Sequence, residues 1–409
     1  MACVRRAVLA TLLLIVPGAC TGDRRIAPEA ELIDSAGVQL RAYDLTETSA
    51  PVLHVIGEPD VQVGSVDGPS EASFSRVTDL AIGGNGWIIV SDAVAGDLRV
   101  FDANGSYQLT LGGQGDGPGE FSIAPAIVGV SGDTVFAFDA GAARLTSFTL
   151  GGDLVDIKTI HETEGRAVAV VRQRNGSFLA QTRWVSPVGP ELFPHDMRLE
   201  LDSVAVLRLN ADAEIMDTLL VMPDRRRLRI VQDRGGGVMS TMETITPYQP
   251  QAFVRSDGEK VIVARSDSMR VRFLSEGGGV QGGVNVLGVQ NPASAEEIRT
   301  RQEARLRAAN GDEPINPIVR QVNLDYLPER LPAFANIVVS EGGDIWVALS
   351  EFDLSEGYDW LVLSPDGELR GQVRTPPSLR LFRVTDRAIF GVWSDELDVP
   401  YVRRYPFVN

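Results

Sequence analysis

The sequence predicts an all-β fold, a six-bladed β-propeller, from three observations. Tight polar turns recur along the chain, and each is followed by a short apolar strand. The turns lie about 45 residues apart in three intervals and about twice as far apart in two, which is typical of four-stranded propeller blades. An isolated strand precedes the first unit, and the last unit is one strand short, so the two can close a ring.

The recurring turns are built from Gly, Asn and Asp, which supply the positive φ angles that short hairpins need. The first turns of the six units are Asn85-Gly86, Gly132-Asp133, Asn175-Gly176, Asp257-Gly258, Gly342-Gly343-Asp344 and Thr385-Asp386. The apolar strands that follow them cover 87–90, 134–138, 177–180, 260–263, 345–348 and 388–392. A second set of turns closes the third strand of most units at 104–105, 151–152, 210–212, 276–278 and 365–367.

Both chain termini are expected to contribute to one blade. The last unit has strands at 379–384, 388–393 and 401–408 and then ends, while 51–56 forms a strand before the first unit. A strand from one terminus often completes the blade formed by the other, which removes an open sheet edge. We therefore expect Val52, His54 and Ile56 to pair beside the C-terminal strand, so that the propeller covers 51–409.

The two doubled intervals predict insertions, although they could instead hide extra blades and give seven or eight. The first insertion, 222–249, contains the basic run 225–227, which is either a solvated charge run or a docking site for an anionic partner. The second, 291–331, begins with a helix, because Ser294 and Glu297 form a capping box. We expect this helical insertion to lie on the rim.

The N-terminus is typical of an export signal. Two arginines precede an apolar run, 7–16, that is too short to span a bilayer. The small residues before Cys20 resemble the bacterial lipobox, which implies a lipoprotein-type signal peptide over 1–19 and a lipid at Cys20. Ordinary secretion with cleavage nearby is the alternative. Residues 20–50 would then be a flexible tether, and Thr21 favours the outer membrane of a bacterial cell envelope by the same resemblance.

The charge and cysteine content narrow the classes of partner. The formal net charge of −17 argues against nucleic acid, whose phosphates need a basic surface. An acidic surface of this kind keeps a protein soluble, and we expect a monomer. The chain has 2 cysteines, Cys3 and Cys20, so cleavage before Cys20 leaves no disulfide in the mature protein.

A glycine-rich joint connects the first two units and carries a family resemblance. Residues 138–148, with Asp139 at the end of one strand and Arg144-Leu145 at the start of the next, resemble the core of an NHL repeat. Residues 91–101 share this frame, but Asp97 stands where the arginine is expected. The joint at 115–121 is similar to the family's blade connection. The resemblance implies an NHL- or TolB-like six-bladed propeller of the bacterial lipoprotein kind, with the joint in a structural role.

The same resemblance implies an enzymatic alternative, a divalent-cation-dependent hydrolase or lyase, lactonase-like, with its site in the axial channel. Channel candidates are Arg76, Asp79, Asn336 and Arg383, on the predicted inner strands. A Ca²⁺ site needs about six to eight oxygens, and one Asp with one Asn falls short. The chain's 3 histidines have no metal-binding spacing, and no G-x-S-x-G motif is present. The sequence therefore predicts no cofactor and no metal.

A loop of the third unit is the best candidate for a binding surface. It carries Arg183, Trp184, Phe193 and His195, and aromatic residues and arginine are the usual anchors of interfaces. The alternative is that Trp184 and Phe193 fold back onto the rim. We expect a non-enzymatic binding or scaffold module for a protein or a cell-envelope component, and the sequence leaves that partner open.

Overall fold

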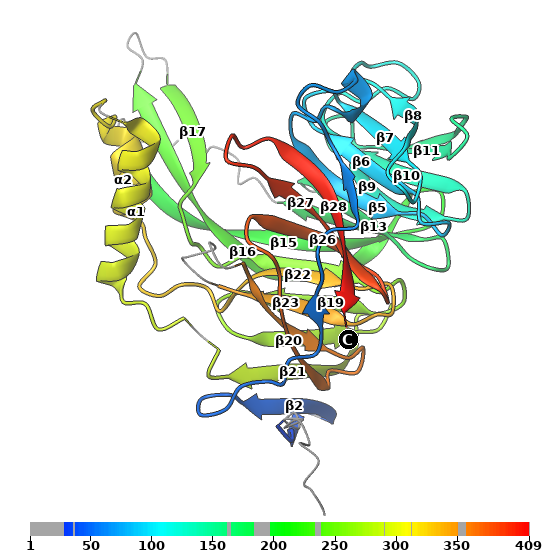
Figure 1. The fold of residues 1–409 in the computed structure, drawn as a ribbon. Helices are drawn as coiled ribbons and strands as arrows, with labels where there is room; N and C mark the ends of the chain where they lie inside the picture. Colours follow the sequence, from blue (N-terminus) through cyan, green and yellow to red (C-terminus); the bar gives the residue numbers. More distant parts are fainter. Residues whose placement is uncertain are drawn as a thin grey trace, which may run out of the picture.

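The strands of the protein form six sheets, arranged as the six blades of a propeller (Figure 1). The computed structural model describes residues 28–35, 37–161, 165–183, 197–233, 239–289, 291–311, 313–350 and 357–408. The innermost strands of neighbouring blades contact one another around the axis at five of the six junctions, and blades three and four meet there through their turns. The predicted all-β fold with six blades is confirmed, and the doubled intervals hold insertions rather than further blades.

Four-stranded meanders are the basic unit of the blades. Blade one contains β5 (Val77–Ile82), β6 (Ile88–Asp92), β7 (Asp97–Phe101) and β8 (Tyr107–Gly112). Blade two contains β9 (Ala126–Ser131), β10 (Thr134–Asp139), β11 (Arg144–Thr149) and β12 (Leu154–Thr159). Blade three contains β13 (Arg166–Arg172), β14 (Phe178–Arg183), β15 (Met197–Leu209), β16 (Ile215–Asp233) and β17 (Met239–Ile245).

The N-terminal segment contributes strands to two of the remaining three blades. Blade four contains β18 (Ala252–Ser256), β19 (Val261–Arg265), β20 (Arg270–Leu274) and β21 (Val280–Leu287). Blade five contains β22 (Phe334–Val339), β23 (Ile345–Leu349), β24 (Asp359–Leu363) and β25 (Leu369–Arg374). Blade six contains β26 (Leu379–Val384), β27 (Ala388–Ser394) and β28 (Pro400–Val408), with β3 (Val55–Ile56) and β4 (Val61–Val63) at its outer edge.

The hydrophobic core lies between neighbouring blades rather than at the axis. Leu80 and Phe101 of blade one pack with Phe390 of blade six. On the other face of blade one, Leu98 packs with Val135 of blade two. Strands alternate their side chains between two faces, so each blade uses both faces to bury apolar residues against its neighbours.

Ring closure is confirmed, but with a different main strand from the one predicted. From 51–56 only β3 pairs with β28, through Ile56 opposite Phe407 and Val55 opposite Val408. The longer pairing is made by β4, with Val61 opposite Arg404 and Val63 opposite Val402. Val61 and Val63 are buried between blades one and six, which explains why this segment takes the edge position.

The first residues of the predicted closing strand take other places. Val52 makes an isolated bridge to Gln372 of blade five and is 67% exposed. The ring of His54 stacks on the ring of Phe407, with centroids 4.2 Å apart.

The predicted tether over 20–50 is corrected for residues 31–44, which form strands. β1 (Glu31–Ser35) and β2 (Val38–Asp44) make a hairpin, and β2 pairs in parallel with β21. Tyr43 is buried in the core of blades four and five, and its hydroxyl accepts the backbone N–H of Leu369 at 2.9 Å. The segment is therefore part of blade four. Residues 1–27, with Cys20, lie outside the described residues. None of the helices in the described ranges has the length and apolar character to span a membrane.

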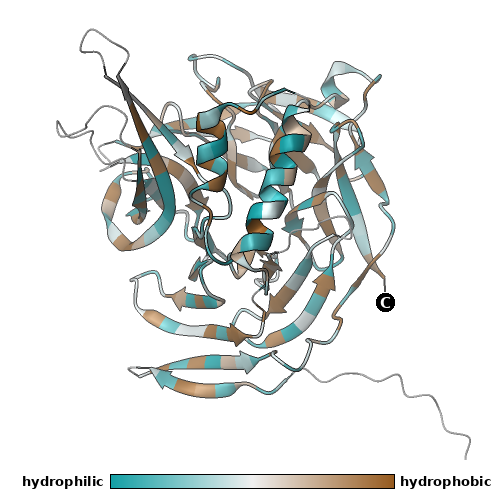
Figure 2. Ribbon diagram, turned by 90° about the vertical axis from the view of Figure 1, so that its left-hand side faces the viewer, coloured by the Kyte–Doolittle hydropathy of each residue, from teal (hydrophilic) through white to brown (hydrophobic). Residues whose placement is uncertain are grey.

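The two predicted insertions form one structural unit, which we call the arm: residues 197–201, 226–233 and 239–245 with the two helices. The first insertion is corrected, because β16 runs through it and pairs with both β15 and β17. The second begins with α1 (Ala295–Asn310), whose predicted capping box at Ser294 is confirmed, and continues with α2 (Pro317–Leu324). Val322 of α2 packs on Leu228 and Ile230 of β16. Figure 1 shows both helices beside β16 and β17, and in Figure 2 the residues of the longer helix are coloured mainly as hydrophilic.

The basic run 225–227 is held in ion pairs rather than being a solvated charge run throughout. Arg227 lies 2.7 Å from Asp202 and also pairs with Glu243, and its side chain is 18% exposed. Arg225 lies 3.7 Å from Asp224. These carboxylates pair with Arg225 and Arg227 within blade three, while Arg226 is exposed.

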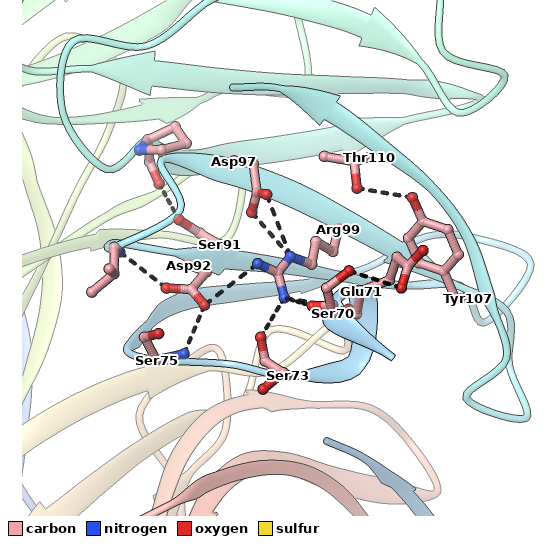
Figure 3. Close-up of polar contacts among 12 residues, drawn as sticks. Ser70, Glu71, Ser73, Ser75, Ser91, Asp92, Asp97, Arg99, Tyr107 and Thr110 are labelled. Carbon is pink, nitrogen blue, oxygen red and sulfur yellow. Dashed lines mark hydrogen bonds and ion pairs between the residues drawn. The ribbon is translucent and has the colours of Figure 1, made fainter. Parts of the chain in front are cut away.

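The frame shared by residues 91–101 and 138–148 holds the connections between blades together. In blade one, the buried Asp92 carboxylate accepts the backbone N–H of Ser75 at 2.9 Å (Figure 3). It also accepts the backbone N–H of Arg76 at 3.2 Å. Arg99, two residues after Asp97, lies 3.8 Å from Asp92 and donates to the Ser73 carbonyl at 2.6 Å. Arg99 therefore makes the contacts with the aspartate and the connecting segment that were expected from an arginine at position 97.

Blade two uses the same frame to hold the glycine-rich connector from β8 to β9. The Asp139 carboxylate accepts the N–H groups of Ser122 and Gly141 at 2.7 and 2.8 Å. Arg144 lies 3.9 Å from Asp139 and donates to the carbonyls of Asp116 and Glu120. The connector also places Phe121 in the core, fully buried. The chain itself thus supplies the contacts that fix this loop.

Replacing Gly112 by alanine is expected to lower stability more than the same change at Gly132. Both glycines have positive φ, 71° and 61°, so each substitution costs about 1–2 kcal/mol of backbone strain. An added Cβ at Gly112 would also overlap the ring of Phe121, whereas one at Gly132 meets nothing within 4 Å. Overpacking adds about 1–3 kcal/mol. Urea unfolding of the two variants measures the difference, and equal losses would contradict this account of the connector.

Asp92→Asn is expected to destabilise the protein in a pH-dependent way. Burial alone would raise the pKa of Asp92, but the N–H groups of Ser75, Val94 and Arg76, with Arg99, lower it below the ordinary value. The stabilisation is therefore complete above the unfolded-state pKa, at about pH 4, and is lost as the pH falls through the lower folded-state pKa.

We expect Asp92→Asn to cost about 2–4 kcal/mol at neutral pH, because it removes charge-assisted hydrogen bonds in a buried site. The difference from the parent protein should shrink below about pH 4. Urea unfolding across this range, with the exposed Asp133→Asn as the control, measures it. A loss independent of pH would contradict the assigned role of the carboxylate.

Candidate functional site

The inner strands share a backbone irregularity that determines which side chains face the axis. Five of the six carry a β-bulge, in which one extra residue shifts the register against the second strand; these residues are Thr78, Val128, Val168, Ala335 and Phe382. A bulge redirects the neighbouring side chains and often lies beside a functional site. The predicted channel residues Asp79, Asn336 and Arg383 each follow a bulge directly.

A cavity of about 670 Å³ lies along the axis and is lined by all six inner strands. Its volume is within the range of small-molecule sites, about 300–1,000 Å³. Apolar residues such as Val128, Val170 and Ile337 form part of the wall. At one end the turns of blades three and four meet, where the N–H of Arg174 donates to the Gly258 carbonyl at 2.8 Å.

The charge of this cavity is opposite to that of the whole chain. Among the described residues that line it, five are arginines and two are aspartates: Arg172, Arg174, Arg255, Arg380, Arg383, Asp79 and Asp257. Lysine, histidine, glutamate, cysteine and tyrosine do not occur in this set. The chain as a whole has a net charge of −17. The axis is therefore a positive region inside an acidic protein.

Both aspartates are engaged by the protein. Asp79 Oδ2 accepts the N–H of Ile127 in blade two at 2.8 Å, and Oδ1 accepts the N–H of Leu80 at 2.8 Å and Arg383 at 3.3 Å. Asp257 Oδ1 accepts the N–H groups that follow it in the turn, at 2.9 and 2.7 Å. Asp79 thus joins two blades and orients Arg383.

Arg255 is the most constrained cation of the cavity. Its Nε donates to the Ile337 carbonyl at 2.8 Å, Nη1 to the Val254 carbonyl at 3.0 Å, and Nη2 to Asn336 Oδ1 at 3.4 Å. Burial and the neighbouring Arg383 lower the pKa of Arg255 to about 10, against the opposing effect of Asp79. The guanidinium therefore stays charged at neutral pH, in a site that penalises the charge.

Two further arginines lie over aromatic rings. The guanidinium of Arg172 is 4.7 Å from the centre of the Phe136 ring, and that of Arg380 is 4.6 Å from the Phe382 ring. Arg380 also donates to a backbone carbonyl of blade one. Stacking on a ring holds an arginine in place while its edge stays available for hydrogen bonds.

The structure brings together three of the four predicted channel residues and adds arginines that the sequence reading missed. Asp79, Asn336 and Arg383 line the cavity, but Arg76 does not, because it lies exposed at the start of β5. The sequence pattern predicts inner strands over 167–171 and 252–254, which end one position before Arg172 and Arg255. Extending each strand to its turn would have shown these arginines.

The cavity does not fit the divalent cation of the enzymatic alternative. Ca²⁺ takes about six to eight oxygen ligands, but both Asp79 oxygens and the Asn336 oxygen already accept protein N–H groups. Over the ranges that the structure covers, no three His, Cys, Asp or Glu side chains gather closely enough to hold a metal ion. The surrounding arginines would also repel a cation.

The predicted binding loop is described only at its first residue. Trp184, Phe193 and His195 lie outside the described residues. Arg183 ends β14, and its Nε donates to Asp224 Oδ2 at 3.0 Å. Asp224 is fully buried and also accepts the Ala252 N–H at 2.9 Å, so it connects Arg183 to β18.

The comparisons with known proteins agree with the fold. A family model described as a 6-bladed beta-propeller matches residues 69–168. A candidate exported protein from Bacteroides fragilis is similar with a TM-score of 0.50 and 11% identity, over 90% of this chain and 100% of that one. A protein from Bacteroides vulgatus has a TM-score of 0.40 at 11% identity (94% and 100% covered). Virginiamycin B lyase from Staphylococcus aureus has a TM-score of 0.39 and 9% identity, over 81% of this chain and 95% of that one. No curated protein matches.

Asp79→Asn is expected to lower the free energy of unfolding by about 1–3 kcal/mol. The donors around Asp79 now bind two carboxylate oxygens, and an asparagine would offer them only one. Calcium should leave the melting temperature of the parent and the variant unchanged, since Asp79 binds Ile127 and Arg383 rather than an ion. Thermal unfolding with calcium and with chelator measures both effects. A calcium-dependent rise in the parent that disappears in Asp79→Asn would restore the enzymatic alternative.

Proposed function

We propose that the protein is a non-enzymatic binding or scaffold module of the bacterial cell envelope, exported and held to a membrane by a lipid at Cys20. The export and the lipid rest on the sequence of residues 5–20. The observation that supports a binding role best is the arm, because its two insertions are unnecessary for ring closure and yet are joined into one ordered unit.

The arm is fixed by polar as well as apolar contacts. Gln302 of α1 donates to Asn323 of α2 at 3.1 Å, and Gln249, after β17, donates to the Tyr326 carbonyl at 2.8 Å. On the sheet, Arg229 pairs with Glu243 at 3.0 Å and with Glu200 at 3.4 Å. A part with this many ordered contacts presents its surface at low entropic cost to a partner.

Apolar side chains are exposed on the face of the arm that carries α2. Met242 lies opposite Ile230, and Leu199 lies opposite Leu228, so Leu201 and Met242 share the face that packs on α2. Leu201 is 54% exposed, Met242 46% and Val319 of α2 42%. Exposed apolar residues grouped on an ordered element favour a protein as the partner.

The predicted binding loop is continuous with this surface along the chain. Residues 184–196 connect β14 to β15, and Met197, the first residue of β15, belongs to the arm and packs against its apolar cluster around Leu228 and Ile230. Trp184 and Phe193 would add aromatic anchors to the same partner surface. The proposal therefore places one interface on the arm and this loop.

A photo-crosslinking amino acid at Met242 is expected to give one discrete adduct in cells that produce the protein naturally, because a partner would cover this face. The same amino acid at Val155, which is 54% exposed on β12 of blade two, should give none. Gel analysis and mass spectrometry of the adducts make the measurement. Adducts that are absent, or identical at both positions, would contradict the proposal.

Trp184→Ala combined with Phe193→Ala should reduce the Met242 adduct several-fold, while Asp79→Asn leaves it unchanged. If the loop substitutions do not change the Met242 adduct, the loop is not part of the interface, and this part of the proposal is wrong.

A further inference from the structure

We propose that the axial cavity binds a small organic molecule bearing an oxyanion, a carboxylate or a phosphate group. The inference is independent of the arm and goes beyond the scaffold role. It rests on the arginines of the cavity, on donors buried in its wall, and on its size.

The protein neutralises only part of the positive charge of the cavity, where Arg174 pairs with Glu259 at 2.9 Å. Arg255 and Arg172 form no ion pair with a carboxylate among the described residues. Arg383 has one carboxylate partner among the described residues, Asp79, and shares it with two backbone N–H groups. Gathering like charges in a site of reduced solvation is costly, and an anion at the axis would offset that cost.

The bonds of Arg255 orient its charge without neutralising it. Its three acceptors, the carbonyls of Ile337 and Val254 and the amide oxygen of Asn336, are all neutral. A guanidinium has five N–H groups, so two have no acceptor in the described part of the chain. Planar oxyanions are the groups that such a fork binds bidentately.

A second observation comes from the wall of blade three. Gln173 lines the cavity and is 3% exposed; its Oε1 accepts the Ser256 hydroxyl at 3.1 Å. Its Nε2 and the Nε of Arg172 are buried donors without a hydrogen-bond partner in the described ranges. A buried donor without an acceptor costs about 1–3 kcal/mol, so the wall of blade three carries unused donor capacity beside the arginines.

The size and the wall of the cavity limit the class of ligand. About 670 Å³ is far more than a bare phosphate ion fills, and the wall includes Val128, Val170 and Val338 as well as the arginines. A ligand with an acid group and an organic body fits both features. The catalytic alternative has no support here, because neither aspartate of the lining is free of backbone donors.

The test is isothermal titration of the purified full chain with citrate and with inorganic phosphate, in the presence of chelator. We expect saturable binding of at least one probe, weakened by added sodium chloride, because the interaction is between charges. Citrate alone would identify a carboxylate ligand, and phosphate alone a phosphate ligand; either supports the proposal.

Substitutions then locate the site. Arg255→Gln and Arg383→Gln should each weaken binding about tenfold or more, as expected for a lost charged hydrogen bond. Arg370→Gln, on the exposed side of blade five where Arg370 pairs with Asp344 at 2.7 Å, removes the same charge elsewhere and should not weaken it.

If Arg255→Gln does not fold, Arg172→Gln replaces it, since the Arg172 guanidinium is placed by the Phe136 ring. Absence of saturable binding by both probes, or equal weakening by Arg370→Gln and the cavity variants, would overturn the proposal.

Discussion

Closure of the ring by β28 is the constraint on which the rest of the structure depends. β28 pairs with β27 on one edge and with β4 and β3 on the other, so one sheet contains both ends of the propeller. Without this strand pairing, blades one and six would not bury Phe101 against Phe390, and each blade would expose a face. Only a closed ring directs six inner strands at one axis. The positive cavity is thus a consequence of closure, since its arginines come from three different blades, the third, the fourth and the sixth.

The sequence could predict what depends on local chemistry. Glycine-containing turns, alternating strands and the capping box at Ser294 are set by residues close to one another, and the structure has all of them. It could not predict pairings between distant segments. β2 lies parallel to β21, held by Tyr43 in the core of two blades, and nothing in residues 38–44 indicates that partner. The closing role of Val61 likewise depends on burial between blades that are distant in sequence.

The arm shows a second limit of sequence patterns. β16 reads as an insertion because residues 222–249 include the basic run 225–227 and lack the alternation of a blade strand except briefly near 228–231. Its polar face is satisfied by Asp202, Glu200 and Glu243, carboxylates of the neighbouring strands. A charged strand is stable only when its partners are in place, and pairing is a property of the fold. For the same reason Arg255 and Arg172 reveal their role only when six strands converge.

The opposed charges of the surface and the axis are compatible with one another. At physiological ionic strength the field of an exposed charge decays over about 8 Å, so an acidic exterior has little effect on an anion already inside the cavity. The arginines at the axis are screened less, because protein surrounds them on all sides. An acidic exterior lowers the rate at which anions of any kind encounter the protein. Inside the cavity, paired guanidinium N–H groups bind oxyanions, and they restore affinity only for molecules that fit. The combination favours selectivity over speed of capture, which suits a binding module better than a rapid enzyme.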